Sequence, residues 1–476
     1  MSEQRDRFTE HGQGQVFQFY DDLTPEQKDL LDRQAAEIDL TEVTRLFENL
    51  VQTTSGDSGN ESLADQLSPA PFTPLPKNNG DPALWQTARE TGEAALRAGR
   101  VAAFTVAGGQ GTRLGFDGPK GTFPVTPVTG KSLFQVFAEK ILAASRVFGK
   151  PIPWFIMTSV INHGDTVSFF EQHEFFGLEA ERVHFFSQGL MPAIDDQGKI
   201  LLAGKGEIAL SPDGHGGSLR ALVRSESISK MNAVGIDTIS YFQVDNPLVR
   251  CIDPEFIGFH LLNDSELSSK ALPKRDAAEK VGVFCEKDGQ AVVIEYSDMP
   301  ERLTNERDPN GDLRFRGGSI AIHIFSRELV RRLGTNTDPA LALPFHRARK
   351  KVAHIGDDGN LVEPADPNAN KFEMFVFDAL PFAENPVIIE TAREDDFSPV
   401  KNAEGSDSLQ TSADDQLRQF ARCVNAAGVD LDTDETGLPG IQFEISPLFA
   451  DTEERFVTAW ESQEETPEIT DGTVIE

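Results

Sequence analysis

The sequence predicts a doubly wound α/β fold with a mixed, mostly parallel sheet and helices on both faces. Two uncharged apolar runs, 102–107 and 239–244, show little alternation, which is typical of strands buried on both faces of a sheet. A segment with helical periodicity, 132–148, lies between them. A glycine-rich loop follows the first run directly. Strands that alternate with helices in this way predict parallel pairing.

We expect residues 1–95 to form a mainly helical appendage. Thr24-Pro25-Glu26-Gln27 matches a capping box with proline at the first helical position, and apolar residues recur at helical spacing as far as Leu50. The Ser-, Thr- and Gly-rich stretch 52–60 predicts a loop. Five prolines between Pro69 and Pro82 predict an extended connector.

Residues 96–405 are predicted to form the catalytic domain, and 406–476 a small C-terminal domain with an acidic tail. From Glu461 onward we expect this tail to be disordered, because it is acidic and poor in apolar residues. The elements that we expect are helices at 84–98, 132–148, 165–176 and 219–231, strands at 153–159, 183–188, 239–244 and 441–445, and a hairpin of 281–285 with 292–296.

A glycine cluster directly follows the strand at 102–107. It comprises Gly108, Gly109, Gln110, Gly111 and Thr112, and two cations come next, Arg113 and Lys120. Backbone N–H groups without side chains can approach an anionic ligand closely. This combination favours a phosphate or nucleotide site over an ordinary tight turn.

Two common nucleotide loops do not match. No Gly-Lys-Ser/Thr closes the cluster as in a P-loop, and Gly115 falls one residue late for the third glycine of the dinucleotide fingerprint. No acidic residue stands in the expected place on a second strand. A dinucleotide oxidoreductase is therefore excluded.

Asp245 stands at the carboxyl end of the strand at 239–244. A carboxylate there, facing a triphosphate, suits a hard cation such as Mg²⁺ (or Mn²⁺), whose remaining ligands are substrate oxygens and water. The alternative is an aspartate that caps a turn before Pro247.

Composition limits the partners. The chain has 476 residues and a formal net charge of −33, which argues against nucleic-acid binding. A polar N-terminus and the lack of a long apolar run predict neither a signal peptide nor contact with a membrane. Three widely spaced cysteines indicate a reducing compartment. We expect a cytoplasmic protein that is a monomer or weak homo-oligomer.

The glycine loop and Pro119-Lys120-Gly121 resemble the signature of the eukaryotic-type UDP-sugar pyrophosphorylases. The resemblance is strongest to the UDP-N-acetylglucosamine branch, and it covers roughly residues 85 to 405 in family order. Further matching motifs are 152–159, 211–217, 244–246 and 393–403. The resemblance implies a Rossmann-like nucleotide-diphospho-sugar transferase (GT-A-like) fold. It also implies conversion of UTP and a sugar 1-phosphate to UDP-sugar and pyrophosphate.

The resemblance also assigns roles to single residues. Gln188 is expected to contact uracil, although it could instead cap a loop, and Gly214 to contact the ribose. Arg113 and Lys120 are expected to hold the UTP phosphates, and Lys401 the sugar phosphate, unless Lys401 is ordinary surface charge. The expected sugar pocket is His215, Gly282, Glu295, Tyr296, Ser319, Phe375 and Phe377.

Two positions depart from the family pattern. His215 and Ser319 stand where the N-acetylglucosamine enzymes carry asparagine. A serine offers one hydroxyl in place of an amide. Preference for glucose 1-phosphate, or broad specificity, therefore stays open beside N-acetylglucosamine 1-phosphate, and a non-catalytic sugar-nucleotide-binding protein is the rival of another class.

Overall fold

A computed structural model describes residues 3–53, 63–336, 338 and 340–476. The chain forms two compact units. The first contains 1–59, 188–218 and 337–378, and the second contains 60–187, 219–336 and 379–476. The boundaries predicted at 95 and 405 follow sequence order, whereas each unit joins segments that are distant in sequence. Most of the loop predicted at 52–60 lies outside the described residues.

The first unit consists of short helices and small two-stranded sheets. The predicted capping box is confirmed: the Gln27 N–H donates to Thr24 Oγ1 over 3.3 Å, and the Thr24 N–H donates to Gln27 Oε1 over 3.0 Å. Its helices and strands are α1 (Glu3–Glu10), α2 (Pro25–Glu37), α3 (Leu40–Leu46), β5 (Leu190–Pro192), β6 (Leu202–Gly204), β7 (Glu207–Ile208), β8 (Leu210–Pro212), β14 (Phe345–Lys350), β15 (His354–Ile355), β16 (Leu361–Val362) and β17 (Ala369–Met374).

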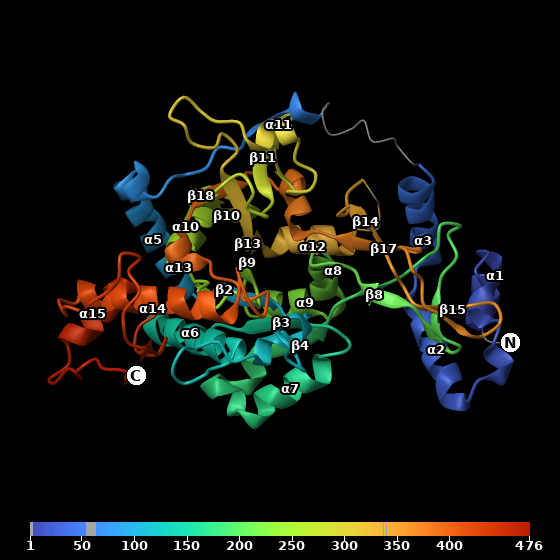
Figure 1. Cartoon of the computed structure of the whole chain (residues 1–476), viewed down its shortest axis with the longest axis horizontal. Coiled ribbons are helices and arrows are strands. Elements are labelled where there is room, and N and C mark those ends of the chain that lie inside the picture. Colours follow the sequence, from blue (N-terminus) through green and yellow to red (C-terminus); the bar gives the residue numbers. More distant parts are fainter. Residues whose placement is uncertain (1–2, 54–62, 337, 339) are drawn as a thin grey trace. The chain divides into compact units, whose positions relative to one another are not determined.

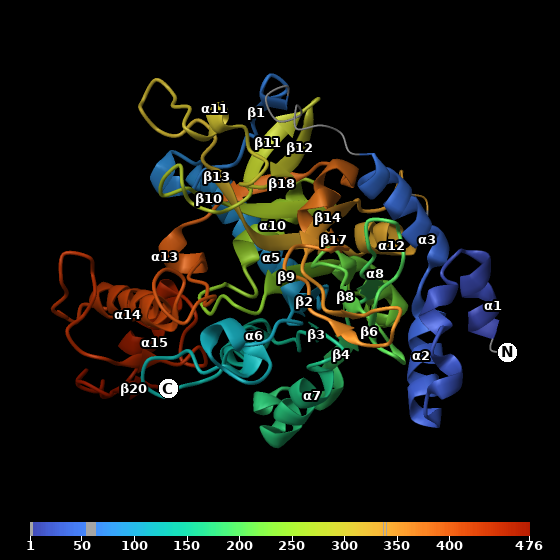
Figure 2. The same cartoon turned by 45° about the vertical axis from the view of Figure 1, so that its right-hand side comes forward.

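Among the described residues, ten strands of the second unit form one mixed sheet. The order β4-β3-β2-β9 is parallel throughout, and β13 pairs antiparallel with β9 (Figure 2). The predicted hairpin is confirmed by antiparallel pairing of β11 with β12. The strands are β1 (Leu67–Pro69), β2 (Val101–Val106), β3 (Trp154–Thr158), β4 (Val183–Ser187), β9 (Thr238–Gln243), β10 (Leu267–Pro273), β11 (Val283–Lys287), β12 (Gln290–Ile294), β13 (Gly317–Ser326) and β18 (Val387–Glu390).

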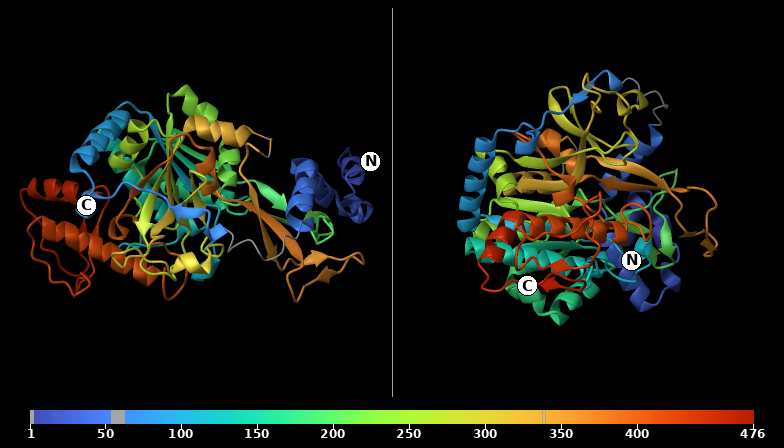
Figure 3. Two further views of the ribbon diagram at one scale, coloured as in Figure 1. Left: turned by 90° about the horizontal axis from the view of Figure 1, so that it is seen from above. Right: turned by 60° about the vertical axis from the view of Figure 1, so that its left-hand side comes forward.

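Helices lie on both sides of this sheet (Figure 3), as predicted. Apolar residues of α5, α6, α7 and α10 form one core with β2 and β3. Helices α5 and α10 cross closely because Gly258 has no side chain: a Cβ there would lie 1.6 Å from the Ala88 carbonyl. The helices are α5 (Pro82–Arg97), α6 (Leu133–Phe148), α7 (His163–Gln172), α8 (Gly217–Arg224, begun in the first unit), α9 (Ser227–Ala233), α10 (Pro254–Leu262), α11 (Glu301–Thr304), α12 (Arg327–Thr335), α13 (Arg393–Asp396), α14 (Leu409–Ala426) and α15 (Glu453–Glu461).

Two local predictions were wrong. The helix predicted at 219–231 is divided into α8 and α9, because Glu226 adopts a left-handed conformation with φ 59°. The acidic tail is not disordered to its end: β20 (Val474–Ile475) pairs in parallel with β19 (Glu444–Ile445). Within the described part of the chain, no helix has the length and apolar character needed to span a bilayer.

Candidate active site

The glycine loop begins where β2 ends and turns back on itself. The Gly111 N–H donates to the Gly118 carbonyl over 2.9 Å, and the Lys120 N–H donates to the Gly109 carbonyl over 3.0 Å. Gly109 is exposed, and a Cβ added to it would meet no atom within 4 Å. The outer side of the loop is therefore open for a ligand to approach its backbone.

Buried contacts fix the inner side of the loop. The side-chain amide of Asn162 donates to the carbonyls of Ala107 and Gly109, over 3.0 and 3.3 Å. A Cβ on Gly121 would lie 2.1 Å from the ring of Phe134 in α6. Asn162 follows β3. It was not among the residues predicted from the sequence, although a polar residue just after a buried strand is a usable signal.

The loop brings Lys120 to the end of the neighbouring strand. Strands β2 and β9 are parallel neighbours, so Asp245, two residues after β9, lies beside the loop. The Lys120 Nζ is 4.0 Å from Asp245 Oδ2, and these side chains are 15% and 16% exposed. Arg113 is exposed and has no ion-pair partner among the described residues.

Asp245 is the candidate magnesium ligand of this site. Within the described residues, no cluster of three His, Cys, Asp or Glu side chains could hold a metal by itself. Mg²⁺ at nucleotide sites uses one or two carboxylates, with substrate phosphates and waters as its other ligands. The single accessible carboxylate of Asp245 fits this arrangement and does not fit a closed structural metal site.

Lys401 lies next to the same strand end. The Val400 N–H donates to the Asp245 carbonyl over 2.7 Å, and the Lys401 N–H donates to the Asp407 carbonyl over 2.7 Å. The Lys401 ammonium is 3.6 Å from the Asp407 carboxylate and 5.6 Å from the centre of the Phe397 ring. Its side chain is 41% exposed, so a ligand can reach this ammonium.

Three of the predicted sugar-pocket residues meet in the second unit. The Ser319 N–H donates to the Gly282 carbonyl over 2.7 Å, and a Cβ on Gly282 would lie 3.4 Å from Glu295 Oε1. The Ser319 hydroxyl is buried and has no hydrogen-bond partner among the described residues. A buried hydroxyl without a partner is unusual in a folded protein. Tyr296, which follows β12, is 48% exposed.

The other predicted ligand residues belong to the first unit. The Gln188 side-chain amide donates to the Gly214 carbonyl over 2.9 Å. Gly214 adopts φ +85°, and a Cβ there would lie 2.4 Å from the Met374 carbonyl, so only glycine fits at this turn. Gln188 is 8% exposed, so its contact with Gly214 agrees with the loop-capping alternative as well as with a ligand role.

His215 is held among aromatic rings. Its ring stacks on Phe375 at 5.4 Å between centroids and lies 5.8 Å from the ring of Phe377. The Val376 N–H donates to His215 Nδ1 over 3.1 Å. Burial lowers the pKa of His215 to about 4, and His346 adds a smaller effect in the same direction. His215 is therefore neutral at physiological pH and cannot serve as a cation for phosphate.

The chain is similar to known proteins over most of its length. The family model described as UTP–glucose-1-phosphate uridylyltransferase matches residues 46–418. The UDP-N-acetylhexosamine pyrophosphorylase-like protein 1 of Xenopus tropicalis is 38% identical, over 91% of this chain and 86% of that protein. The UDP-N-acetylglucosamine pyrophosphorylase of Saccharomyces cerevisiae is 34% identical, over 87% and 88% of the two chains.

Solved structures show the same fold. The uridine diphosphate N-acetylglucosamine pyrophosphorylase of Trypanosoma brucei, at 24% identity, aligns with a TM-score of 0.79 over 100% of this chain and 99% of that one. The UDP-glucose phosphorylase of the same organism, at 16% identity, aligns with a TM-score of 0.62 over 91% and 87%. Taken with the glycine loop and its neighbouring Asp245, the sequence matches establish that this chain belongs to the UTP–glucose-1-phosphate uridylyltransferase family.

Proposed function

We propose that this uridylyltransferase converts UTP and a hexose 1-phosphate to a UDP-sugar and pyrophosphate. The proposed preferred substrate is N-acetylglucosamine 1-phosphate. The observation that carries the proposal is that Lys120, Asp245 and the Lys401 segment meet at the ends of β2 and β9. Two cations and one carboxylate at one strand edge suit a reaction between two phosphate esters. The identity of the curated relatives supports the choice of sugar.

The reaction is a direct displacement at the α-phosphorus of UTP. An oxygen of the sugar phosphate forms the new P–O bond, and the bond to the β-phosphate oxygen breaks with its electron pair leaving on pyrophosphate. The attacking oxygen is already ionised near neutral pH, so no general base is needed. The protein's tasks are positioning and charge neutralisation.

In this scheme the four charged residues bind and neutralise the phosphates and hold the metal ion. Lys120 and Arg113 bind the UTP phosphates and neutralise the departing pyrophosphate, and Lys401 neutralises the incoming sugar phosphate. Asp245 would hold Mg²⁺ (or Mn²⁺), which when bound withdraws charge from the phosphate oxygens. The neutral His215 and the Ser319 hydroxyl are the proposed determinants of sugar specificity, because they stand where the N-acetylglucosamine enzymes carry asparagine.

The test is pyrophosphate release from UTP and Mg²⁺, with N-acetylglucosamine, N-acetylgalactosamine, glucose and galactose 1-phosphates assayed side by side. Preference for N-acetylglucosamine 1-phosphate supports the proposal in full. Preference for glucose or galactose 1-phosphate supports the same chemistry with a retuned pocket, which the orphan hydroxyl of Ser319 favours as the second candidate. No release with any sugar contradicts the assignment.

A further inference from the structure

A buried ion triad lies in the second unit, outside the proposed substrate contacts. Lys270 of β10, Asp253 and Asp396 are 2%, 4% and 2% exposed. The Lys270 ammonium donates to both carboxylates, each over 2.6 Å. Desolvation offsets most of the attraction within such a buried group, so it is weak evidence of a purely stabilising role.

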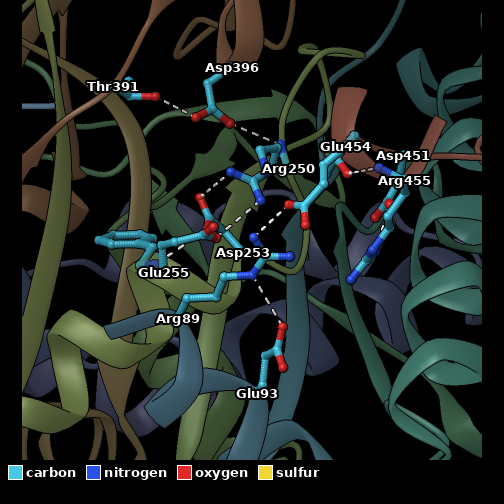
Figure 4. A network of polar contacts seen from close by, with 12 residues as sticks. Arg89, Glu93, Arg250, Asp253, Glu255, Thr391, Asp396, Asp451, Glu454 and Arg455 are labelled. Carbon is cyan, nitrogen blue, oxygen red and sulfur yellow. Dashed lines mark hydrogen bonds and ion pairs between the residues drawn. The ribbon is translucent and has the colours of Figure 1, made fainter. Parts of the chain in front are cut away.

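Asp396 connects two segments that lead to the proposed active site. One of its carboxylate oxygens accepts the backbone N–H of Arg250 over 3.0 Å. The other accepts from Lys270 and from the hydroxyl of Thr391. Figure 4 shows this carboxylate between Thr391 and Arg250. Arg250 lies five residues after Asp245, and Asp396 lies five residues before Lys401.

Asn246 adds a second connection between these segments. Its side-chain amide donates to the Asp396 carbonyl over 2.6 Å, and its side-chain oxygen accepts the Ser398 N–H over 3.0 Å. Asn246 is 5% exposed. The Val400 N–H also donates to the Asp245 carbonyl. Together these hydrogen bonds join residues 396–400, which lead to Lys401, to Asp245 and Asn246.

Asp253 provides a natural contrast. It accepts from the same lysine over the same distance and is buried to nearly the same degree. Its other side-chain contacts include the Phe256 N–H at the start of α10, over 3.3 Å, the Arg250 side chain, 3.5 Å away, and the Glu255 carboxyl group. Among the described residues, Asp253 has no recorded bond to the segment 393–401.

We infer that Asp396 and Asn246 are positioning residues, which hold Lys401 in register with Asp245 for the transfer step. The inference rests on the proposed roles of Lys401 and Asp245. Small displacements of a charged group from the reacting phosphates cost much of its effect on the transition state. The glycine loop is bonded through Asn162 and not through this pair, so nucleotide binding should survive the loss of either residue.

The first test compares Asp396→Asn with Asp253→Asn in the full-length enzyme. Each change removes one charge from the triad, so both should lower the midpoint of unfolding. Asp396→Asn should lower kcat on the order of 10²-fold, while calorimetry with UTP gives an unchanged Kd. Asp253→Asn should keep kcat within a few-fold of wild type. Equal kcat values for the two variants overturn the inference, because stability alone then explains the effect.

Two further variants keep the inference falsifiable. Asn246→Ala leaves the ion triad intact and should reproduce the fall in kcat even where Asp396→Asn folds poorly; wild-type kcat in Asn246→Ala overturns the inference. If Asp396 acts through Lys401, the double variant Asp396→Asn/Lys401→Ala should be no slower than Lys401→Ala alone, whereas fully additive losses overturn the inference. Failure of the proposed function is seen separately, as absence of pyrophosphate release by the wild-type enzyme.

Discussion

The ammonium of Lys120 lies 4.0 Å from the carboxylate of Asp245, although the two residues come from different strand ends. Each side chain is about one-sixth exposed, so most of its surface is shielded from water. Opposite charges in a partly buried position attract more strongly than on the open surface. A nucleotide phosphate with its metal ion supplies partners of both signs and can separate this pair.

Removal of the Lys120 charge should impair catalysis and leave folding intact. We expect Lys120→Ala to lower kcat on the order of 10²-fold or more, because a contact to developing negative charge is lost. Steady-state pyrophosphate release measures the effect. Lys150→Ala is the matched control, since Lys150 is exposed at the end of α6 and has no proposed role. Similar kcat values in the two variants would remove Lys120 from the mechanism.

Asp245 should control the response to metal. Asp245→Asn keeps the size of the side chain and removes its charge, so we expect a fall in kcat on the order of 10²-fold together with a higher Mg²⁺ concentration for half-maximal rate. A Mg²⁺ titration of both enzymes at fixed UTP measures this change. A variant that needs no more Mg²⁺ than wild type would show that Asp245 does not bind the ion.

Signals local in the sequence predicted much of this arrangement. The uncharged runs at 102–107 and 239–244 predicted β2 and β9, and the glycines after the first run predicted the loop at the edge of the sheet. Because both strands belong to one parallel set, their carboxyl ends had to meet. The placement of Asp245 beside Lys120 follows from that topology, while the ligand role of each residue stays a prediction.

Contacts between distant segments were not predictable from the sequence. Asn246 bonds to Asp396 across 150 residues, and Lys270 bonds to Asp396 across 126. A lysine within a predicted strand does not reveal its ion-pair partner, because the partner carboxylate can come from any part of the chain. The break at Glu226 was missed for another reason: a left-handed glutamate is rare, and no glycine marked the position.

The two departures from the family pattern should decide the choice of sugar. Ser319→Asn places an amide at the buried orphan hydroxyl and should raise the preference for N-acetylglucosamine 1-phosphate over glucose 1-phosphate roughly 10-fold in kcat/KM, as one added hydrogen bond does. Ser319→Ala, which removes the hydroxyl and adds no amide, is the control. An unchanged ratio in Ser319→Asn would mean that position 319 does not read the sugar.

Acid should destabilise the protein through a buried histidine. Burial lowers the pKa of His260 to about 4, and its Nδ1 lies 2.9 Å from the Ser268 hydroxyl. In the unfolded chain the pKa is about 6.5, so between these values the unfolded state binds more protons. The free energy of unfolding should therefore fall as pH drops from about 6.5 towards 4, by at most about 3 kcal/mol from this residue.

Urea unfolding at several pH values measures the contribution of His260. His260→Gln should flatten the fall in stability below pH 6.5 relative to wild type, because the group that gains a proton on unfolding is gone. His173→Gln alters an exposed histidine and should leave the slope unchanged. Parallel pH profiles for wild type and His260→Gln would contradict the assignment of the slope to this residue.

Gly121 should be irreplaceable for a steric reason. Its φ is one that any residue can adopt, but a Cβ would lie 2.1 Å from Cε2 and 2.2 Å from Cζ of Phe134. That ring is fully buried and packs against Phe170 at 5.0 Å and Trp154 at 6.3 Å between centroids, so it has no room to move. We expect Gly121→Ala to lower the free energy of unfolding by about 1–3 kcal/mol. It should also lower kcat, because the strain falls next to Lys120.

Gly164→Ala is the control: no atom lies within 4 Å of its added Cβ, and alanine in helix α7 should be neutral or stabilise by up to about 1 kcal/mol. Denaturation midpoints of the two variants decide the matter, and equal stability would show that the α6 core yields to the added methyl group.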